Sequence, residues 1–276
     1  MALFVGSDPE VFLRDSSGEL VNAQQVLPGH KEHPFPTPNG SIQPDNILAE
    51  FNSRPAGNVI EFVENHKLIL SDLMDFIKPL DLQLDFIASA LASDELLSDP
   101  MCRIAGCQPD FNVWKCEVGA KKPTLFANKK ANYRDTNIRA AGGHLHISFD
   151  QADEDTSFAN RFKFVKALDY NLGVMSVLHD PDQDRRKYYG KAGAFRPKVS
   201  AHTDPYNGVE YRTLSNFWLK SEELMKLVYS KVQEVYENLE ELSDKAEYYS
   251  DSIQKIINFG DVNSARVFCV NEGICF

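Results

Sequence analysis

The sequence predicts an α+β fold with a largely antiparallel sheet. Strand-like and helix-like segments follow one another without the regular alternation that parallel α/β folds require. Four short segments carry polar side chains two residues apart, which is the spacing of one face of a strand. Three longer segments carry apolar side chains at the spacing of one helix face, over residues 59–77, 158–178 and 221–242.

The N-terminal part is expected to be mostly strand and loop. Residues 27–46 hold five prolines among several Gly, Asn and His residues, so we expect a long irregular loop there. A loop of that length within a domain is more often functional than neutral. Residues 55–58 are typical of a helix start. The strands expected here cover residues 3–13, 19–21, 47–52 and 82–88.

The C-terminal part is expected to end in helices, over about residues 221–276. Ser221 is a favourable N-cap for the first of them. The apolar stripe of that helix is either a core face or the face of a homodimer, and the sequence leaves both open. A second long loop is expected over residues 180–208, and strands over residues 105–114, 142–149 and 209–214.

Composition and charge exclude several classes of protein. The 276 residues are 43% hydrophobic and 25% charged, which excludes disorder over most of the chain and suits one domain over residues 1–276. No apolar run reaches the roughly 18–20 residues of a membrane span. The N-terminus lacks a basic region, so we expect a cytoplasmic protein without a signal peptide. The net charge of −11 argues against a nucleic-acid partner.

The five cysteines are expected to be reduced, mostly buried thiols. Their number is odd and they form no CxxC pair. The alternative is a zinc site from Cys102, Cys107 and Cys116, although this spacing is poor and no histidine lies nearby.

Four polar pairs indicate a divalent-metal site. The alternative for any one pair is an ordinary solvated sheet face. Such a face would favour Lys, Thr, Ser and Gln, and no lysine occurs in the four pairs. Clustered carboxylates repel one another unless a cation neutralises them, and oxygen donors with an imidazole suit Mg²⁺ or Mn²⁺. The pairs are Asp8 with Glu10, Glu50 with Asn52, His144 with His146, and Glu210 with Arg212.

A basic stretch precedes the last of these pairs. Six Lys and Arg side chains lie between residues 185 and 198. A solvated face is one interpretation, and no Walker A motif occurs in the chain. Arginine and lysine next to a metal cluster are, however, typical of sites that bind a nucleotide triphosphate.

The motifs that carry these residues resemble the phage carboxylate–amine ligases of type 2. This family belongs to the glutamine synthetase-like amidoligases, which include glutamate–cysteine ligases. The motifs extend from residue 6 to about residue 218. They are SDPEVF at residues 7–12, DNILAEFN at 45–52, GGHLHI at 142–147 and GVEYRTLS at 208–215, with YGKAGAFR at 189–196 between the last two.

The resemblance implies a glutamine synthetase-like catalytic fold, in which a curved, largely antiparallel sheet backed by helices holds ATP and two or three divalent ions. The metal-ligand positions of the family fall on Glu10, Glu50, His144 and Glu210. A phosphate-binding arginine falls on Arg212. Asp8, Asn52 and His146 are second candidates for metal or substrate. The nucleotide-phosphate cations are expected at Arg185, Arg186, Lys191 and Arg196.

The implied activity is an ATP- and Mg²⁺-dependent ligation of a small-molecule or peptide carboxylate to an amine through an acyl phosphate. The amine must lose a proton, and Asp110 and Asp8 are the candidate bases. Glutamine synthetase has a separate N-terminal domain with no counterpart ahead of residue 3 here, which puts ammonia as nucleophile and a large ring assembly in doubt. The alternatives are a metal-dependent hydrolase that uses His144 and His146, and a non-catalytic phage protein that retains the fold.

Overall fold

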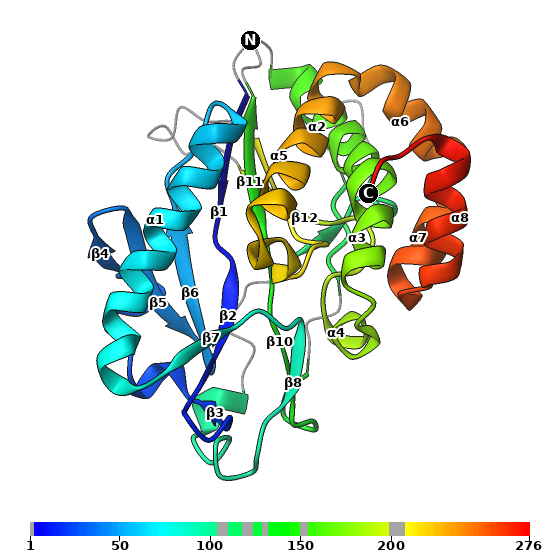
Figure 1. The fold of residues 1–276 in the computed structure, drawn as a ribbon. Coiled ribbons are helices and arrows are strands. Elements are labelled where there is room, and N and C mark those ends of the chain that lie inside the picture. Colours follow the sequence, from blue (N-terminus) through cyan, green and yellow to red (C-terminus); the bar gives the residue numbers. More distant parts are fainter. Residues whose placement is uncertain (1–2, 104–109, 118–123, 129–131, 150–153, 199–207) are drawn as a thin grey trace.

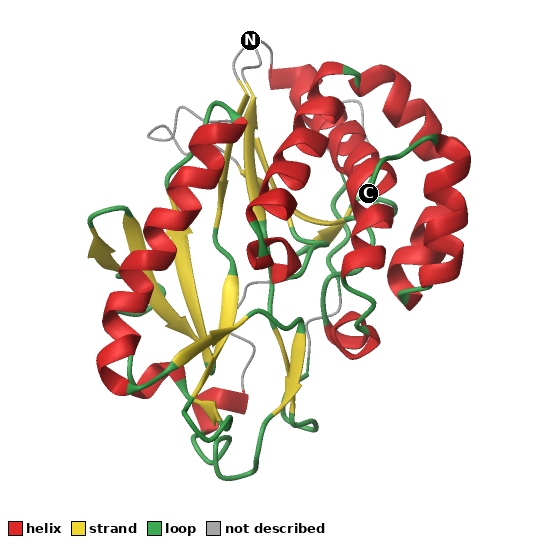
Figure 2. Cartoon of the chain, viewed as in Figure 1, coloured by secondary structure: helices red, strands yellow, loops and turns green. Residues whose placement is uncertain are grey.

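The strands of this chain form two larger sheets and one small ribbon, with helices packed against them (Figures 1 and 2). The computed structural model describes residues 3–103, 110–117, 124–128, 132–149, 154–198 and 208–276. Every strand pairing among these residues is antiparallel. The expected α+β class with a largely antiparallel sheet is therefore confirmed.

The first sheet has five strands, and its middle carries two of the predicted polar pairs. Neighbours in this sheet come from distant parts of the sequence, because the N-terminal strand pairs with the strand that follows Gly142 and Gly143. The order is β1 (Leu3–Ser7), β11 (Leu145–Phe149), β13 (Gly208–Tyr211), β12 (Ala194–Lys198) and β9 (Phe111–Asn112).

The second sheet carries Glu10 and the pair Glu50 with Asn52. Its order is β3 (Leu20–Val21), β2 (Glu10–Arg14), β6 (Leu48–Ser53), β5 (Gly40–Asp45) and β4 (Phe35–Thr37), and β7 (Gln83–Asp85) also pairs with β2. A separate ribbon joins β8 (Ser89–Leu91) to β10 (Ile138–Ala140).

The two larger sheets are joined by the chain between β1 and β2. The sequence predicts one strand over residues 3–13, and the structure divides it at Asp8 and Pro9. Proline has no N–H to donate to a strand partner, so regular pairing is interrupted there. The chain thereby passes from the first sheet into the second, with Asp8 and Glu10 at the junction.

The helices cover the apolar faces of the sheets. Helix α1 packs against β5 and β6, α2 packs against β13, and α5 packs against β1. None of the described helices is both long and apolar enough to cross a membrane. The helices are α1 (Val59–Ile77), α2 (Glu154–Leu168), α3 (Val174–His179), α4 (Gln183–Tyr188), α5 (Glu222–Glu237), α6 (Leu239–Tyr248), α7 (Ser250–Phe259) and α8 (Val262–Glu272).

Local sequence explains where two of these helices begin. The Asn58 side chain accepts a hydrogen bond from the backbone N–H of Glu61, and this cap starts α1. Ser221 caps α5 in the same way through the N–H of Leu224. The apolar stripe of α5 packs inside the chain, since Met225, Val228, Val232 and Val235 are buried. It is therefore a core face, and the homodimer stays a prediction.

The core lies on the side of the strands opposite the polar pairs. Strand alternation places the intervening residues there, and all are fully buried. The polar residues of each sheet thus share the other side of the strands. The buried residues are Ala49, Phe51, Leu145, Ile147, Val209 and Tyr211.

Two expected loops contain regular structure, and both expectations were wrong in that respect. Residues 27–46 include β4 and β5, because prolines are tolerated at the positions of an edge strand that donate no hydrogen bond. Residues 180–208 include α4 and β12, although residues 199–207 lie outside the described part. The helix predicted over residues 158–178 is interrupted by a π-helical turn at Asp169–Gly173.

The described cysteines are free thiols. Cys102 and Cys269 are buried, Cys116 is half-buried and Cys275 is exposed. Cys107 lies outside the described residues, so the alternative zinc site is not tested. The candidate metal-binding groups within the described residues contain no cysteine.

Candidate metal and phosphate site

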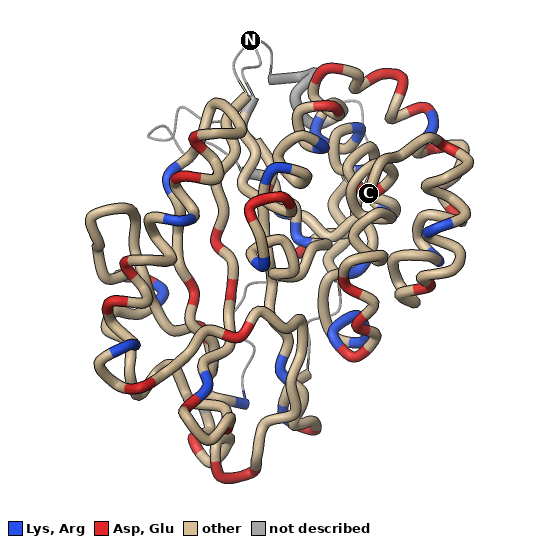
Figure 3. The backbone as a smooth tube through the Cα atoms, viewed as in Figure 1, with Lys and Arg blue, Asp and Glu red and all other residues tan. Residues whose placement is uncertain are grey.

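Strand register brings the predicted polar pairs into cross-strand rows. In the first sheet, His146 lies opposite Glu210, and Glu210 lies opposite Arg196. In the second sheet, Glu10 lies opposite Glu50. Acidic positions therefore appear on the central strands as well as on the outer helices (Figure 3).

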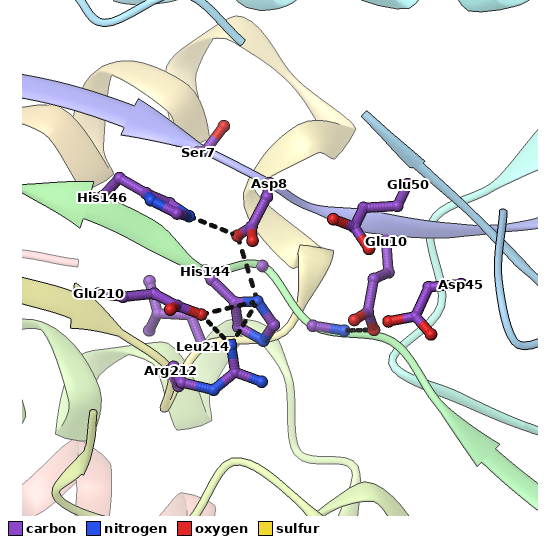
Figure 4. Close-up of polar contacts among 12 residues, drawn as sticks. Ser7, Asp8, Glu10, Asp45, Glu50, His144, His146, Glu210, Arg212 and Leu214 are labelled. Atoms are coloured by element: carbon purple, nitrogen blue, oxygen red, sulfur yellow. Dashed lines mark hydrogen bonds and ion pairs between the residues drawn. The ribbon is translucent and has the colours of Figure 1, made fainter. Parts of the chain in front are cut away.

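The first cluster gathers around the Asp8 carboxylate (Figure 4). One ligand atom each from Asp8, His146 and Glu210 lies within 4.8 Å of the others. His146 Nε2 is 2.9 Å from Asp8 Oδ1. His144 belongs to the same cluster, because its Nδ1 lies 3.2 Å from Asp8 Oδ1 and 3.8 Å from Glu210 Oε1. Four predicted residues thus meet at one point of the first sheet.

The second cluster consists of three carboxylates, from Glu10, Asp45 and Glu50, whose oxygens lie within 4.8 Å of one another. Figure 4 shows it beside the first cluster, on the far side of the strand break at Asp8. Glu10 and Glu50 are direct cross-strand neighbours, and like charges in that position are destabilising. A bound cation would remove this cost.

Two glycines allow the chain to pass close to these clusters. The Gly142 N–H donates to Glu10 Oε2 at 2.7 Å. A Cβ on Gly142 would lie 2.2 Å from His144 Nε2, and one on Gly143 would lie 2.1 Å from the Ser215 carbonyl oxygen. The Gly-Gly step ahead of His144 is therefore required for the close approach of this segment to the site.

Electrostatics in the second cluster oppose full ionisation without a cation. Burial and the Asp45 charge raise the pKa of Glu10 to about 8. Burial, followed by the Asp8 and Asp45 charges, raises the pKa of Glu50 well above its ordinary value. The cluster therefore binds protons at neutral pH unless a metal ion replaces them.

In the first cluster, electrostatics favour an ionised Asp8 carboxylate and a neutral His144 ring. Burial alone would raise the pKa of Asp8, but the neighbouring His146 and His144 outweigh it and hold the pKa well below its ordinary value. Burial and the nearby Arg212 charge lower the pKa of His144 to about 3. The His144 ring is therefore neutral at neutral pH, which is the form that binds metals.

Both clusters fit a divalent cation. The first offers carboxylate oxygens with imidazole nitrogen and the second offers three carboxylates, and Mg²⁺ and Mn²⁺ accept such donors. The alternative of a solvated sheet face does not fit, because His144, Glu10 and Glu210 are only 2%, 5% and 6% exposed. Buried acidic groups of this kind need a partner charge.

Arg212 lies at the edge of the first cluster and links it to Asp110. Its Nη1 donates to Glu210 Oε1, and its Nε lies 3.5 Å from Asp110 Oδ2. The second oxygen of Asp110 accepts from Asn128 Nδ2 at 2.9 Å. Arg196 reaches the same cluster, with Nη1 3.3 Å from Glu210 Oε1. Of the arginines predicted to bind phosphate, Arg212 and Arg196 thus contact Glu210, a candidate metal ligand.

Arg185 and Arg186 are held by backbone carbonyl oxygens and a neighbouring carboxylate. The buried Arg185 guanidinium donates to three backbone carbonyl oxygens, of Ala141, Thr213 and Leu214, at 2.8, 2.9 and 2.5 Å. It therefore fastens the segment ahead of His144 to the segment behind Arg212. These three hydrogen bonds favour a structural role for Arg185 over the phosphate role that the sequence predicts.

Arg186 is also buried, and its Nη1 donates to the Asp182 carbonyl oxygen and lies 3.7 Å from Asp180 Oδ2. These contacts likewise favour a structural role for Arg186 over the predicted phosphate role. Lys191 is half-buried, and burial with the Arg186 charge lowers its pKa. Asn52 lies two residues beyond Glu50 on the same face, where its Nδ2 donates to Ser41 Oγ at 3.2 Å.

Sequence reasoning missed two residues of the site. Asp45 was quoted only as part of a motif, because residues 27–46 were expected to be a loop. A signal for the β5–β6 hairpin was present in the Asp45-Asn46 dipeptide, and Asn46 adopts a positive φ of 56° at that turn. Tyr189 was also missed, although its hydroxyl is 2.7 Å from His144 Nε2. A sequence gives no direct signal for that contact.

Three solved structures show distant similarity to this chain. A novel glutamine synthase homolog has a TM-score of 0.44 and 11% identity, over 98% of this chain and 67% of that one. GmaS without ligand has a TM-score of 0.41 and 12% identity, over 100% of this chain and 70% of that one. A bifunctional glutathione synthetase from Pasteurella multocida has a TM-score of 0.43 and 10% identity, over 99% of this chain but only 49% of that one.

The family comparison is more specific. No curated protein matches the chain. Residues 133–266 match the model of the phage phiEco32-like COOH.NH2 ligase-type 2 family, and this range, just under half of the chain, contains His144, Glu210 and Arg212. Asp8, Glu10 and the other N-terminal ligands precede it, so their assignment depends on geometry. The match confirms the resemblance to type 2 carboxylate–amine ligases that the sequence motifs predicted, and it supports a C–N ligase.

Proposed function

We propose that this protein is an ATP- and Mg²⁺-dependent amidoligase that joins a carboxylate to an amine. The observation that carries the proposal is the pair of adjoining buried clusters beside Arg212, in which Glu10 and Glu50 face each other directly. Such an arrangement is costly for a protein that binds no cation. The family match supports the reaction class.

Each cluster would hold one divalent cation. Asp8, Glu210 and an imidazole would hold the first, and Glu10, Asp45 and Glu50 the second. Bound there, Mg²⁺ supplies charge neutralisation for the phosphates of ATP, and Mn²⁺ suits the same donors. Asp8 is thus a metal ligand in this proposal.

Arg212 and Arg196 would bind the phosphate groups. Both guanidinium groups lie at Glu210, so they stand next to the proposed metal ligands. Their fork geometry suits the equatorial oxygens of a phosphoryl group in transfer. Lys191 stays a weaker candidate, because no contact within the described part of the chain places its ammonium at the clusters.

The chemistry needs ATP because a carboxylate would have to expel oxide to form an amide. One carboxylate oxygen takes the γ-phosphoryl group, which gives an acyl phosphate and ADP. The amine nitrogen then attacks the acyl carbon, and the C–O bond to phosphate breaks as the C–N bond forms. The nitrogen gives up a proton, and Asp110 is the carboxylate nearest Arg212 that stands outside both metal clusters.

The test is ADP release from ATP and Mg²⁺ in the presence of pooled amino acids, peptides and polyamines. We expect ADP only when a carboxylate and an amine are both present. Glu50→Gln and Glu210→Gln should abolish calorimetric binding of Mg·ATP, whereas Glu222→Gln, at an exposed ion pair with Lys67, should leave it unchanged.

Two results would refute the proposal. One is unchanged Mg·ATP affinity in both cluster variants of a folded protein. The other is turnover without nucleotide together with tightly bound zinc, which would instead support the metal-dependent hydrolase, since both His144 and His146 contact Asp8. No thermal shift with Mg·ATP would favour a non-catalytic protein.

A further inference from the structure

Tyr189 lies where α4 ends and touches both the proposed metal site and the proposed phosphate site. Its hydroxyl is 2.7 Å from His144 Nε2 and accepts from Arg212 Nη2. The ring lies edge-on to the His144 imidazole, with centroids 5.5 Å apart. The Arg212 guanidinium carbon stands 5.2 Å from the ring centre. One side chain therefore contacts the imidazole and the guanidinium together.

Arg185 and the backbone at Gly190 hold the Tyr189 ring in place. The guanidinium carbon of the buried Arg185 is 5.3 Å from the centre of the Tyr189 ring. The next residue, Gly190, has a φ of 63°, and a Cβ there would lie 1.9 Å from Arg185 Nη1. The backbone therefore turns directly after Tyr189 and packs against a fixed guanidinium, so the hydroxyl has a defined position.

The contacts of the two ring nitrogens show which way the His144 ring faces. Arginine has only N–H donors, and Arg212 Nη1 lies 3.3 Å from His144 Nδ1. Nδ1 also lies 3.2 Å from Asp8 Oδ1, so in the cation-free chain it can either accept from Arg212 or donate to Asp8. A cation at Nδ1 would leave the ring proton on Nε2, where the Tyr189 oxygen can accept it while also accepting from Arg212.

His144 Nδ1 faces the two carboxylates. Nδ1 lies 3.2 Å from Asp8 Oδ1 and 3.8 Å from Glu210 Oε1. One ring nitrogen and two carboxylate oxygens therefore converge, and these are donor atoms that a divalent cation accepts. A metal-binding imidazole generally donates its other N–H to a partner that fixes ring and tautomer.

We propose that Tyr189 is a positioning residue: its hydroxyl holds the His144 imidazole with Nδ1 toward Asp8 and Glu210 and ties that ring to Arg212. This inference depends on the proposed function, because it takes the first cluster as a metal site. It extends that function, since it couples cation affinity to the arginine that would contact phosphate.

The test uses Mn²⁺ as the probe on the full chain. Tyr189→Phe removes only the hydroxyl and keeps the ring. Tyr188→Phe is the matched control, because the Tyr188 ring packs toward Tyr133. Mn²⁺ affinity is measured by electron paramagnetic resonance titration. Nitrogen coupling is measured by pulsed resonance in a His146→Gln background, where His144 is the imidazole left in the first cluster.

We expect Tyr189→Phe to weaken the nitrogen-coupled Mn²⁺ by about 10- to 100-fold and to alter its nitrogen coupling. The ion at Glu10, Asp45 and Glu50 should keep its affinity, and Tyr188→Phe should behave as wild type. Wild-type affinity and nitrogen coupling in Tyr189→Phe would overturn the inference. So would equal weakening of both ions, which would mean general loosening of the fold.

Failure of the proposed function gives a different result. If wild-type protein binds no nitrogen-coupled Mn²⁺, the metal centre itself is refuted and this inference with it. If wild type binds that ion and only the Tyr189→Phe prediction fails, the metal centre stands. Thermal unfolding of each variant establishes that the compared proteins are folded.

Discussion

Glu10→Gln should stabilise the cation-free protein at neutral and higher pH. The pKa of the Glu10 carboxyl is raised in the folded chain from 4.5 to about 8, chiefly by burial and then by Asp45. Folding therefore favours the protonated form. The stability associated with that proton is fully present below about pH 4.5 and is lost as pH rises through about pH 8. Glutamine carries no charge and avoids this loss.

The size of the effect follows from the same two values. A rise in the pKa of this carboxyl from 4.5 to about 8 corresponds to up to about 5 kcal/mol of unfolding free energy. For a chain of this length, that is a difference of about 10–20 °C in melting temperature at the alkaline end. The hydrogen bond from the Gly142 N–H persists, because the glutamine carbonyl oxygen can accept it.

The assay is denaturant unfolding of wild type and Glu10→Gln from about pH 5 to about pH 8, with a chelator and with Mg²⁺. Without metal, the variant should become the more stable protein as pH rises. With Mg²⁺, wild type should gain more than the variant, because only wild type keeps all three carboxylates. Equal pH profiles without metal, or a variant less stable at the alkaline end, would refute the reasoning.

Three further predictions concern residues around the clusters. Arg185→Met should lower the free energy of unfolding by about 3–5 kcal/mol, because the Ala141 and Thr213 carbonyls lose this donor and the Leu214 carbonyl keeps only the Gly143 N–H. A folded variant with normal stability but weak ATP binding would instead support a phosphate role for Arg185. Gly142→Ala should weaken Mn²⁺ binding by about 10-fold or more, because its Cβ would displace the His144 ring, and unchanged affinity would contradict this. Asp110→Asn should reduce turnover by about 10²- to 10⁴-fold while Mg·ATP affinity persists, and full activity would remove Asp110 as the base.

The part of the site that strand periodicity controls could be predicted from sequence. Residues two apart in an extended segment point to the same side. This spacing alone predicts that His144 and His146 share a face, and that Glu210 and Arg212 do so as well. Antiparallel register then places Glu210 beside His146. The apolar residues between the pairs predicted which side is buried, and the structure confirms this for Leu145 and Ile147 among others.

The features that the sequence did not predict depend on tertiary contacts. Arg185 and Arg196 look alike in a basic stretch, yet one donates to backbone carbonyls and the other reaches Glu210. A charge pattern does not distinguish these environments. Asp45 was missed because a proline-rich segment predicts a loop, whereas pairing of β5 with β6 makes it a strand. The π-helical turn at Asp169–Gly173 likewise comes from packing.

The most direct test of the account is a crystal structure with Mn²⁺ and a non-hydrolysable ATP analogue, with Mn²⁺ located by anomalous scattering. The account predicts one ion among Asp8, His144 and Glu210, another among Glu10, Asp45 and Glu50, and phosphates against Arg212. Mn²⁺ peaks absent from both clusters, or a nucleotide bound away from Arg212, would contradict the claim that this sheet face is a ligase active site.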